Sequence, residues 1–226
     1  MTRPPHPISP YLAPGFYEDA IAKGRHRDIV GGRWSETGRA QMAALLSAGM
    51  TPKDHLLDIG CGALRLGHLA VPYLDPGHYW GTDASLALMQ HGRQVELPDP
   101  ARLPEAQLVE DTTFALPGIP ATITLAIAWG VFTHLPIDAL EAALHSVAQR
   151  LPALRSFLFT VFLAPDGAAA APVRQADGVV THPDRAPRHF RLEDVLRLAA
   201  AAGLVAVPQP DRLPRGQVLF IARHPG

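Results

Sequence analysis

The sequence predicts an α/β fold in which a mostly parallel β-sheet is covered by helices on both faces. From residue 55 onward, short apolar runs alternate with helical patterns of about 10–15 residues, which is typical of a parallel sheet. The runs 123–130 and 156–163 are almost entirely apolar, as expected for central strands that are buried on both faces. The runs 204–209 and 217–223 are joined too briefly for a crossover helix, so we expect them to pair antiparallel.

Residues 1–50 are expected to form an N-terminal arm followed by a small helical cap. The first part of this region is rich in proline, which predicts an extended arm. Helical patterns follow, and the pair Gly31-Gly32 divides them into two expected helices. Ser35 is the expected N-cap of the second helix, and Gly49 its expected end.

Residues 51–226 are expected to form one further domain. The expected strands are 55–60, 78–83, 106–111, 123–130, 156–163, 204–209 and 217–223. The expected helices are 64–74, 85–95, 137–151 and 192–203. The segment 164–189 shows no clear period. We expect it to be a long loop over the top of the sheet that helps to form a binding pocket.

Composition and charge weigh against several classes of function. The net charge is −1 over 226 residues, so the sequence lacks the basic surface that nucleic-acid binding needs. No apolar run approaches the roughly 18–20 residues that cross a bilayer, and we therefore expect no membrane partner. The first ten residues lack the apolar core of a secretion signal. Histidines and carboxylates show no metal-ligand spacing, so no metal is expected.

The single cysteine, Cys61, excludes an internal disulfide and fits a reducing cytoplasm. It lies inside a tight glycine turn, where a small side chain is needed, and we expect it to pack there rather than to act as a nucleophile. We therefore expect a cytoplasmic protein. We further expect a monomer or a homodimer.

The stretch "HLLDIGCGALRLGHL" (55–69) carries the strongest functional signal. An apolar strand ends in Asp58, the turn Gly60-Cys61-Gly62 follows, and a helix then starts. In open parallel sheets, ligands bind beyond the carboxyl ends of the strands, and the glycines allow close approach to the backbone. A dinucleotide turn needs a third glycine where Arg65 stands, and the G-K-[ST] of a P-loop is absent. An acid at this turn suits a ligand ammonium, which indicates an amino-acid group.

Two further acids lie at the ends of the next strands. Asp83 follows the glycine turn by about 20 residues, a spacing that suits hydrogen bonds from both ribose hydroxyls. Asp111 and Thr112 follow the third strand, where an acid could receive an adenine amino group. Ribose, adenine and an amino acid together indicate S-adenosylmethionine.

These motifs resemble those of the class I S-adenosylmethionine-dependent methyltransferases. The similar segments are "LLDIGCGALRLG", "YWGTDAS", "VEDTTF", "LAIAWGVFTHLP" and "FRLEDVLRLAAAAGL". The resemblance implies a Rossmann-like, seven-stranded sheet in which only the last strand is antiparallel. It also implies a cofactor site in which Asp58, Gly60 and Gly62 hold the methionine part, Asp83 the ribose and Asp111 the adenine amine, while Trp129 and Gly130 lie beside the sulfonium. Cys61, Ala84 and Thr112 complete the expected cofactor site.

The expected reaction is an in-line transfer of a methyl group to a small-molecule acceptor, at oxygen or nitrogen, with S-adenosylhomocysteine as the product. A hydroxyl acceptor needs a base, and histidine suits that role near neutral pH. His134 follows the fourth strand on the ligand side, although it could instead position the helix that starts near Pro136. His26, in the cap, is the second candidate, with a solvated surface histidine as the alternative.

Other functions stay open at this stage. A protein or RNA methyltransferase is an alternative, as is a protein that binds S-adenosylmethionine without transferring its methyl group. The "[DN]PP[YF]" motif of amino-methylating enzymes is absent, and "AWGV" stands in its place. A dinucleotide-dependent oxidoreductase is disfavoured because the third glycine is missing.

Overall fold

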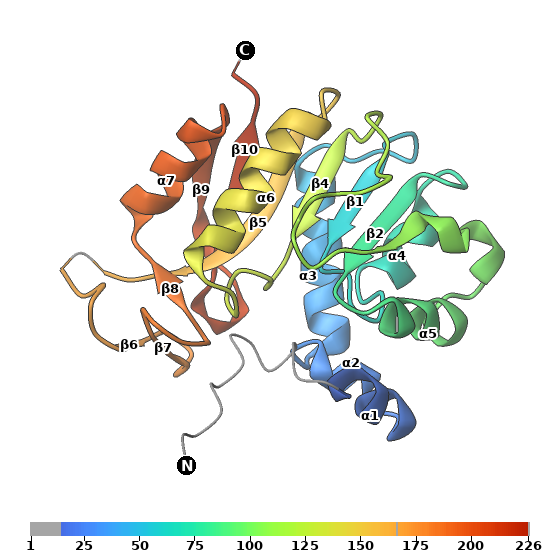
Figure 1. The fold of residues 1–226 in the computed structure, drawn as a ribbon, viewed down its shortest axis with the longest axis horizontal. Helices are drawn as coiled ribbons and strands as arrows, with labels where there is room; N and C mark the ends of the chain where they lie inside the picture. The colour runs from blue at the N-terminus through green and yellow to red at the C-terminus, as the bar shows by residue number, and fades with distance from the viewer. Residues whose placement is uncertain (1–14, 166, 226) are drawn as a thin grey trace.

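The computed structural model describes residues 15–165 and 167–225, and it has a central sheet between two layers of helices (Figure 1). The sheet runs in the order β3-β2-β1-β4-β5-β10-β9. Its strands are β1 (Leu56–Ile59), β2 (Tyr79–Asp83), β3 (Leu108–Glu110), β4 (Leu125–Ala128), β5 (Ser156–Leu163), β9 (Val205–Arg212) and β10 (Val218–Arg223). The expected arm lies largely outside the described residues.

The strand directions confirm the predicted sheet. β1 pairs in parallel with β2 and β4, β2 with β3, and β4 with β5, whereas β10 is antiparallel to both of its neighbours. A short additional strand, β8 (His189–Phe190), pairs in parallel with the end of β5. All of the parallel strands therefore end at the same edge of the sheet.

Each face of the sheet has its own apolar core because neighbouring residues of a strand point to opposite sides. Leu57 and Phe157 pack into the core beneath α6 (Ile137–Arg150) and α7 (Leu192–Ala201). Leu56 and Leu158 pack into the opposite core, with residues from α3 (Trp34–Ser47), α4 (Gly67–Tyr73) and α5 (Leu86–Glu96). This double burial explains why the strands of the sheet centre are almost continuously apolar.

The cap contains three helices where the sequence predicted two. They are α1 (Phe16–Ala22), α2 (His26–Ile29) and α3. The predicted break at Gly31-Gly32 is present, with φ of 93° and 63°, but Gly24 adds an earlier break at φ 64°. Glycine reaches this left-handed region without steric cost, so the chain turns there before α2 begins.

The predicted N-cap of α3 was wrong by two residues. The helix begins at Trp34, with Arg33 as the cap residue in a left-handed conformation (φ 49°), so Ser35 lies inside the first turn. The predicted end was correct, because Gly49 follows the helix with φ 84°. A later helix differs in the opposite direction: α4 begins at Gly67, after the predicted start at residue 64, since Leu64 has φ 64° and holds the preceding turn open.

The segment 164–189 is not the featureless loop that the sequence predicted. It contains a hairpin of β6 (Val173–Arg174) and β7 (Val180–Thr181) that precedes β8. The Thr181 hydroxyl lies 2.9 Å from Nδ1 of His189 and accepts from the Gln175 amide at 3.0 Å, and all three side chains are buried. These polar partners are close in sequence but show no periodic pattern, so the sequence alone did not reveal the hairpin.

The described part of the chain also forms the 3₁₀ turns η2 (Pro100–Arg102), η3 (Glu105–Gln107) and η4 (Pro214–Gly216). Over the described residues, no helix has both the length and the hydropathy that a bilayer crossing demands.

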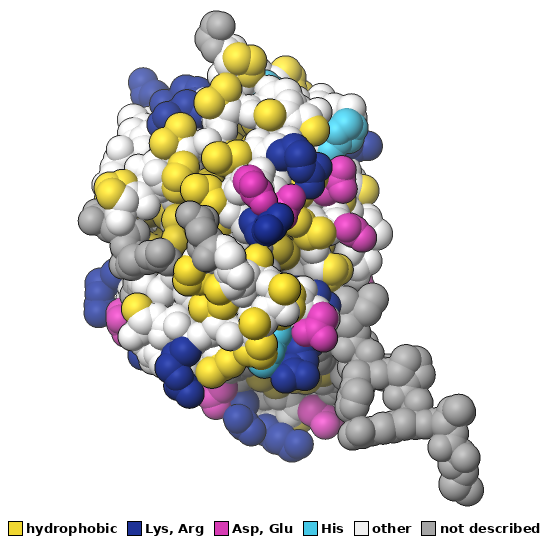
Figure 2. All heavy atoms as spheres, turned by 90° about the vertical axis from the view of Figure 1, so that its left-hand side faces the viewer, with side chains coloured by type: hydrophobic (Ala, Val, Ile, Leu, Met, Phe, Trp, Pro, Cys, Tyr) yellow, Lys and Arg dark blue, Asp and Glu magenta, His cyan; other side chains and the backbone are white. Residues whose placement is uncertain are grey.

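The face formed by α7 and the edge strand β9 carries exposed apolar side chains among charged ones (Figure 2). Val205 is 55% exposed and Val207 48%, and Leu192 is 40% exposed. Pro208 and Pro210 lie in the same strand and have no N–H to offer a further strand. The prolines thus weaken the edge as a template for strand pairing.

Candidate functional site

A pocket opens at the edge where the parallel strands end, and the cap forms its opposite wall. The sheet side is lined by residues at and after the ends of β1, β2, β3 and β4. The cap side is lined by residues of α2, α3 and the Gly31 turn, and the C-terminal part adds Arg215 and Gln217. All of the predicted cofactor residues line this pocket: Asp58, Gly60, Cys61, Gly62, Asp83, Ala84, Asp111, Thr112, Trp129 and Gly130.

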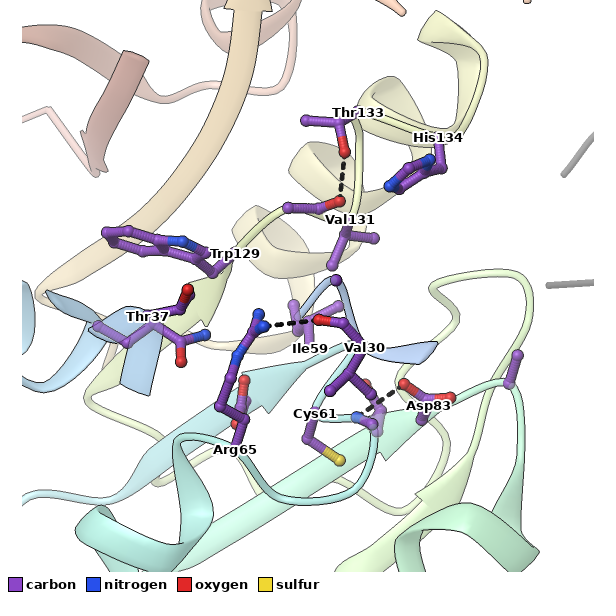
Figure 3. Close-up of a pocket in the computed structure, with 18 of the residues that line it drawn as sticks. Val30, Thr37, Ile59, Cys61, Arg65, Asp83, Trp129, Val131, Thr133 and His134 are labelled. Carbon is purple, nitrogen blue, oxygen red and sulfur yellow. Dashed lines mark hydrogen bonds between the residues drawn. The ribbon is translucent and has the colours of Figure 1, made fainter. Parts of the chain in front are cut away.

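The turn after β1 requires its two glycines. Gly60 and Gly62 have φ of 71° and 55°. A Cβ on Gly62 would lie 2.6 Å from the Val30 side chain, and one on Gly60 would clash with Val131. The backbone of this turn is therefore closely enclosed from both walls of the pocket (Figure 3).

Asp58 is only 2% exposed and accepts a hydrogen bond of 2.7 Å from the Tyr79 hydroxyl. Burial raises the pKa of Asp58 to about 7, against the opposing effects of the Tyr79 hydrogen bond and the charge of Arg65. A cation bound beside this carboxyl would favour its ionised form.

Asp83 connects the second strand to the glycine turn. Its carboxylate accepts from the backbone N–H of Gly62 at 2.9 Å and from that of Ser85 at 3.3 Å. Burial raises the pKa of Asp83 to about 6. Gly60 and Cys61 both donate backbone N–H bonds to the Thr82 carbonyl, at 2.7 and 3.0 Å. These contacts fix the two strand ends relative to each other.

Cys61 has a packing role in this geometry. Its Sγ fills the space beside Gly81, where a Cβ would lie 2.8 Å away. Burial, followed by the charges of Asp58 and Asp83, raises the pKa of the thiol well above its ordinary value. The thiolate that a nucleophile needs is thus disfavoured.

The carboxylate of Asp111 is occupied by its own loop. It accepts from the backbone N–H groups of Thr113, Ala115 and Leu116 at 2.9, 3.2 and 2.8 Å, and from the Thr113 hydroxyl at 3.1 Å. Local bonds of this kind are typical of an aspartate that shapes a turn. The predicted contact of Asp111 with an adenine amine stays a prediction.

The end of β4 is tied to the C-terminal strand by a polar chain. The Gly130 N–H donates to the Thr160 hydroxyl at 2.8 Å, and that hydroxyl donates to the side-chain oxygen of Gln217 at 2.7 Å. Trp129, 8% exposed, precedes this glycine and faces the cap residue Thr37 across the pocket (Figure 3).

The structure places the two predicted bases differently. His134 lines the pocket just after Thr133 (Figure 3), and burial, followed by the charge of Arg215, lowers its pKa. His26 is not among the lining residues. Its Nε2 lies 2.7 Å from Oε1 of Glu96, on α5, and its Nδ1 lies 3.3 Å from the ring of His91.

Glu96 joins the cap to α5. In addition to His26, it accepts two bonds of 2.7 Å from the guanidinium of Arg27, which stacks over Trp34 at 5.2 Å. Burial alone would raise the pKa of Glu96, but the bonds from Arg27 and His26 outweigh burial and lower it. His26 thus lies in an ion-pair cluster between the cap and α5.

Sequence reasoning missed several cap residues of the pocket, Arg65 and the C-terminal wall. Val30, Thr37 and Gln41 line it, as do Arg65 and Arg215. The interruption of the glycine pattern at position 65 was the one visible signal, because a long cation stood where a dinucleotide site needs a glycine. None of the described residues of 164–189 lines the pocket, since the β6–β7 hairpin lies on the β5 side of the sheet (Figure 1).

No protein-family model matches this sequence, and a comparison with curated proteins finds no match. Solved structures do match. Magnesium protoporphyrin IX methyltransferase from Synechocystis PCC 6803 with bound S-adenosylmethionine has a TM-score of 0.62 at 15% identity, covering 99% of this chain and 100% of that chain. The complex of the glycopeptide N-methyltransferase MtfA with S-adenosylmethionine has a TM-score of 0.59 at 17% identity, covering 84% and 95%.

A third match has a similar extent. The S-adenosylmethionine-dependent methyltransferase from Clostridium acetobutylicum ATCC 824 has a TM-score of 0.59 at 12% identity, covering 92% of this chain and 99% of that chain. Sequence identities this low support a shared fold but do not establish a shared activity. The strand order, the single antiparallel strand and these matches together show that the chain has the fold of the class I S-adenosylmethionine-dependent methyltransferases.

Proposed function

We propose that this protein is an S-adenosylmethionine-dependent methyltransferase that acts on a small-molecule acceptor, at oxygen or nitrogen. The observation that carries the proposal is the pair of carboxyl groups, buried Asp58 and half-buried Asp83, beside one glycine turn in one pocket. Two such acids favour a ligand with an ammonium and hydroxyl donors, and they would repel a diphosphate. Solved proteins with this fold bind S-adenosylmethionine, S-adenosylhomocysteine or sinefungin.

The residues can be assigned to parts of the cofactor. We assign Asp58 and the glycine turn to the methionine end and Asp83 to the ribose hydroxyls, and the common pocket that these residues line supports this assignment. Asp111 holds the loop that carries Thr112, and this loop is the proposed adenine side. Trp129 and Gly130 are proposed to lie beside the sulfonium.

When bound, the cofactor would supply an activated methyl group. The chain's own contribution is to hold the acceptor in line and to exclude water, and alignment alone can supply up to about 7–11 kcal/mol in ideal cases. The lowered pKa of His134 keeps its imidazole neutral at pH 7, the form that accepts a proton from a hydroxyl or an ammonium acceptor. His134 is therefore the proposed general base.

Binding tests the proposal first. We expect calorimetry to detect S-adenosylhomocysteine but not NAD⁺. The absence of S-adenosylhomocysteine binding would contradict the cofactor assignment. Transfer of labelled methyl to a panel of small hydroxyl and amine acceptors then separates an enzyme from a silent binder. Acceptance only of proteins or RNA would contradict the small-molecule assignment. A monomeric or homodimeric state and a cytoplasmic location stay predictions.

The base assignment has its own test. His134→Gln should lower kcat by about 10²- to 10⁴-fold, the usual range for a lost general base, with little change in the affinity for S-adenosylhomocysteine. His145→Gln is the matched control. His145 is exposed on α6, and its ring lies 2.7 Å from the side-chain amide of Gln149. Equal kcat for the two variants would remove His134 from the mechanism.

A further inference from the structure

Arg65 lines the pocket at a position where the fold does not require a charged side chain. It lies three residues after Gly62, where a dinucleotide turn has a glycine. Its Nη1 donates to the carbonyl of Val30 at 2.6 Å and to that of Gly32 at 3.3 Å. Figure 3 shows its guanidinium in the space between Trp129 and Val30. The cap backbone therefore holds a cation inside the pocket wall.

This cation lies close to the buried acid of the same turn. The charge of Arg65 opposes the rise that burial causes in the pKa of Asp58, so the two groups interact across the turn. Both residues line the pocket. An amino-acid zwitterion carries the complementary pair of charges, with an ammonium for the acid and a carboxylate for the guanidinium. A guanidinium can donate two parallel N–H bonds to such a carboxylate.

A second and independent observation concerns Gln41, which lies on α3 one helical turn after Thr37. Gln41 is 4% exposed and lines the pocket. Within the part of the chain that the structure describes, its side-chain oxygen Oε1 is buried without a hydrogen-bond donor. A buried acceptor without a donor costs about 1–3 kcal/mol, so such atoms commonly mark a bound group.

We propose that Arg65 donates to the carboxylate of the cofactor's amino-acid end, and that Gln41 accepts from its ammonium beside Asp58. This inference rests on the proposed function and deepens it. It explains why a long cation follows the glycine turn and why a buried amide oxygen meets no hydrogen-bond donor among residues 15–165 and 167–225. The alternative is that Arg65 serves only to attach the cap to the turn.

Three ligands separate these possibilities when their affinities are measured by calorimetry or displacement on the full chain. S-Adenosylhomocysteine carries both charges of the amino-acid end. Its decarboxylated analogue, S-adenosyl-3-thiopropylamine, keeps the ammonium alone, and 5′-methylthioadenosine lacks both groups. Loss of cap attachment would weaken all three ligands, whereas loss of one contact would weaken only the ligands that carry its partner.

For Arg65→Met, which keeps an unbranched apolar stem, we expect S-adenosylhomocysteine to bind about 10- to 100-fold more weakly, as for a lost charge-assisted bond. The decarboxylated analogue and 5′-methylthioadenosine should weaken equally and by less than S-adenosylhomocysteine, by below about 10-fold, because they lose only the effect of the cap contacts. Arg65→Lys keeps the charge without the planar fork and should fall between wild type and Arg65→Met. An equal loss for all three ligands, or no loss, would overturn the Arg65 assignment.

For Gln41→Leu, we expect S-adenosylhomocysteine and the decarboxylated analogue to weaken alike, by about 3- to 10-fold, because both carry the ammonium. The affinity for 5′-methylthioadenosine should stay unchanged. Uniform effects on the three ligands would overturn the Gln41 assignment. If the wild-type protein binds no S-adenosylhomocysteine, the proposed function itself fails, a result distinct from wild-type binding with no selective loss in the variants.

Discussion

The two walls of the pocket are held in place by different kinds of contact. On the sheet side, backbone N–H groups of the glycine turn donate to the Thr82 carbonyl and to the Asp83 carboxylate. On the cap side, the chain is held by side chains: Arg65 donates to Val30, Arg215 donates to Gly31 at 2.8 Å, and Glu96 binds the cap through an ion pair. The sheet wall thus depends on backbone geometry, whereas the cap wall can be loosened one side chain at a time.

The largest expected effect is on the sheet wall. Gly60→Ala places a methyl group against Val131 and forces a non-glycine residue to φ 71°. Left-handed strain and overpacking together should lower the free energy of unfolding by about 2–4 kcal/mol and abolish measurable S-adenosylhomocysteine binding. Denaturant unfolding and calorimetry measure the two effects.

Gly118→Ala is the matched control for this change. Gly118 has the same φ of 71°, but a Cβ there meets no atom within 4 Å. We expect only the strain, about 1–2 kcal/mol, and unchanged ligand binding. Equal destabilisation of the two variants would show that close approach to Val131 is unimportant.

The next effect is the pH dependence of the stability of the unliganded protein, which reports on Asp58 and Asp83 in the sheet wall. The folded pKa of Asp58, about 7, exceeds the ordinary value of 3.8, so the folded protein binds more protons than the unfolded chain between these values. The stability that this carboxyl contributes is fully present below about pH 4 and is lost as the pH rises through about 7. S-Adenosylhomocysteine affinity should change oppositely, because an ammonium prefers the ionised acid.

Asp58→Asn removes the titrating carboxyl group and so isolates its contribution to the pH dependence of stability. The variant should lose about 2 kcal/mol of the pH dependence of unfolding between pH 5 and 8, and a weaker slope from Asp83, with a pKa of about 6, should persist. Thermal unfolding over a pH series measures both slopes. Identical slopes in the variant and the wild type would contradict the assignment of the raised pKa to Asp58.

The smallest effect is expected at the cap. Glu96→Gln removes the charge that pairs with Arg27 and His26, and because Arg27 is 55% exposed the loss of global stability should be about 1 kcal/mol or less. The cap should open more often, and S-adenosylhomocysteine affinity should fall about 3- to 10-fold. Limited proteolysis near Gly24 measures the opening.

Glu105→Gln removes an ion pair of the same charge type, with Arg93 at 3.4 Å, that is more exposed and does not involve the cap. Its ligand affinity and proteolysis rate should match those of the wild type. If the two variants behave alike, Glu96 has no special role in holding the cap.

The same contrast explains how much could be predicted from the sequence. The sheet, its order of elements and the turns that line its edge follow from alternating apolar runs and from glycines and acids at strand ends, so Asp58, Gly62 and Asp83 were predicted to meet and they do. These signals are local, because each strand and the turn that follows it lie within a dozen residues.

The cap contacts depend on residues distant in sequence and leave no such signal. His26 was predicted to face the acceptor, yet it lies 70 residues from the acid that it contacts, Glu96. Gln41 and Arg215 reach the pocket only through the packing of α3 and the turn before β10. The β6–β7 hairpin was missed for a different reason. Its buried hydrogen bonds join nearby residues, Gln175, Thr181 and His189, that form no repeating pattern.

The position of β10 has a consequence for how the protein is made. β10 follows β9 along the chain, yet it lies between β5 and β9 in the sheet. Gln217, the residue before β10, accepts the hydrogen bond that ends the polar chain from Gly130 through Thr160. While a ribosome is still producing residues 218–223, β9 has no partner in the sheet and the pocket lacks part of its wall. Nascent chains should therefore gain ligand-binding competence only after this final strand has left the exit tunnel.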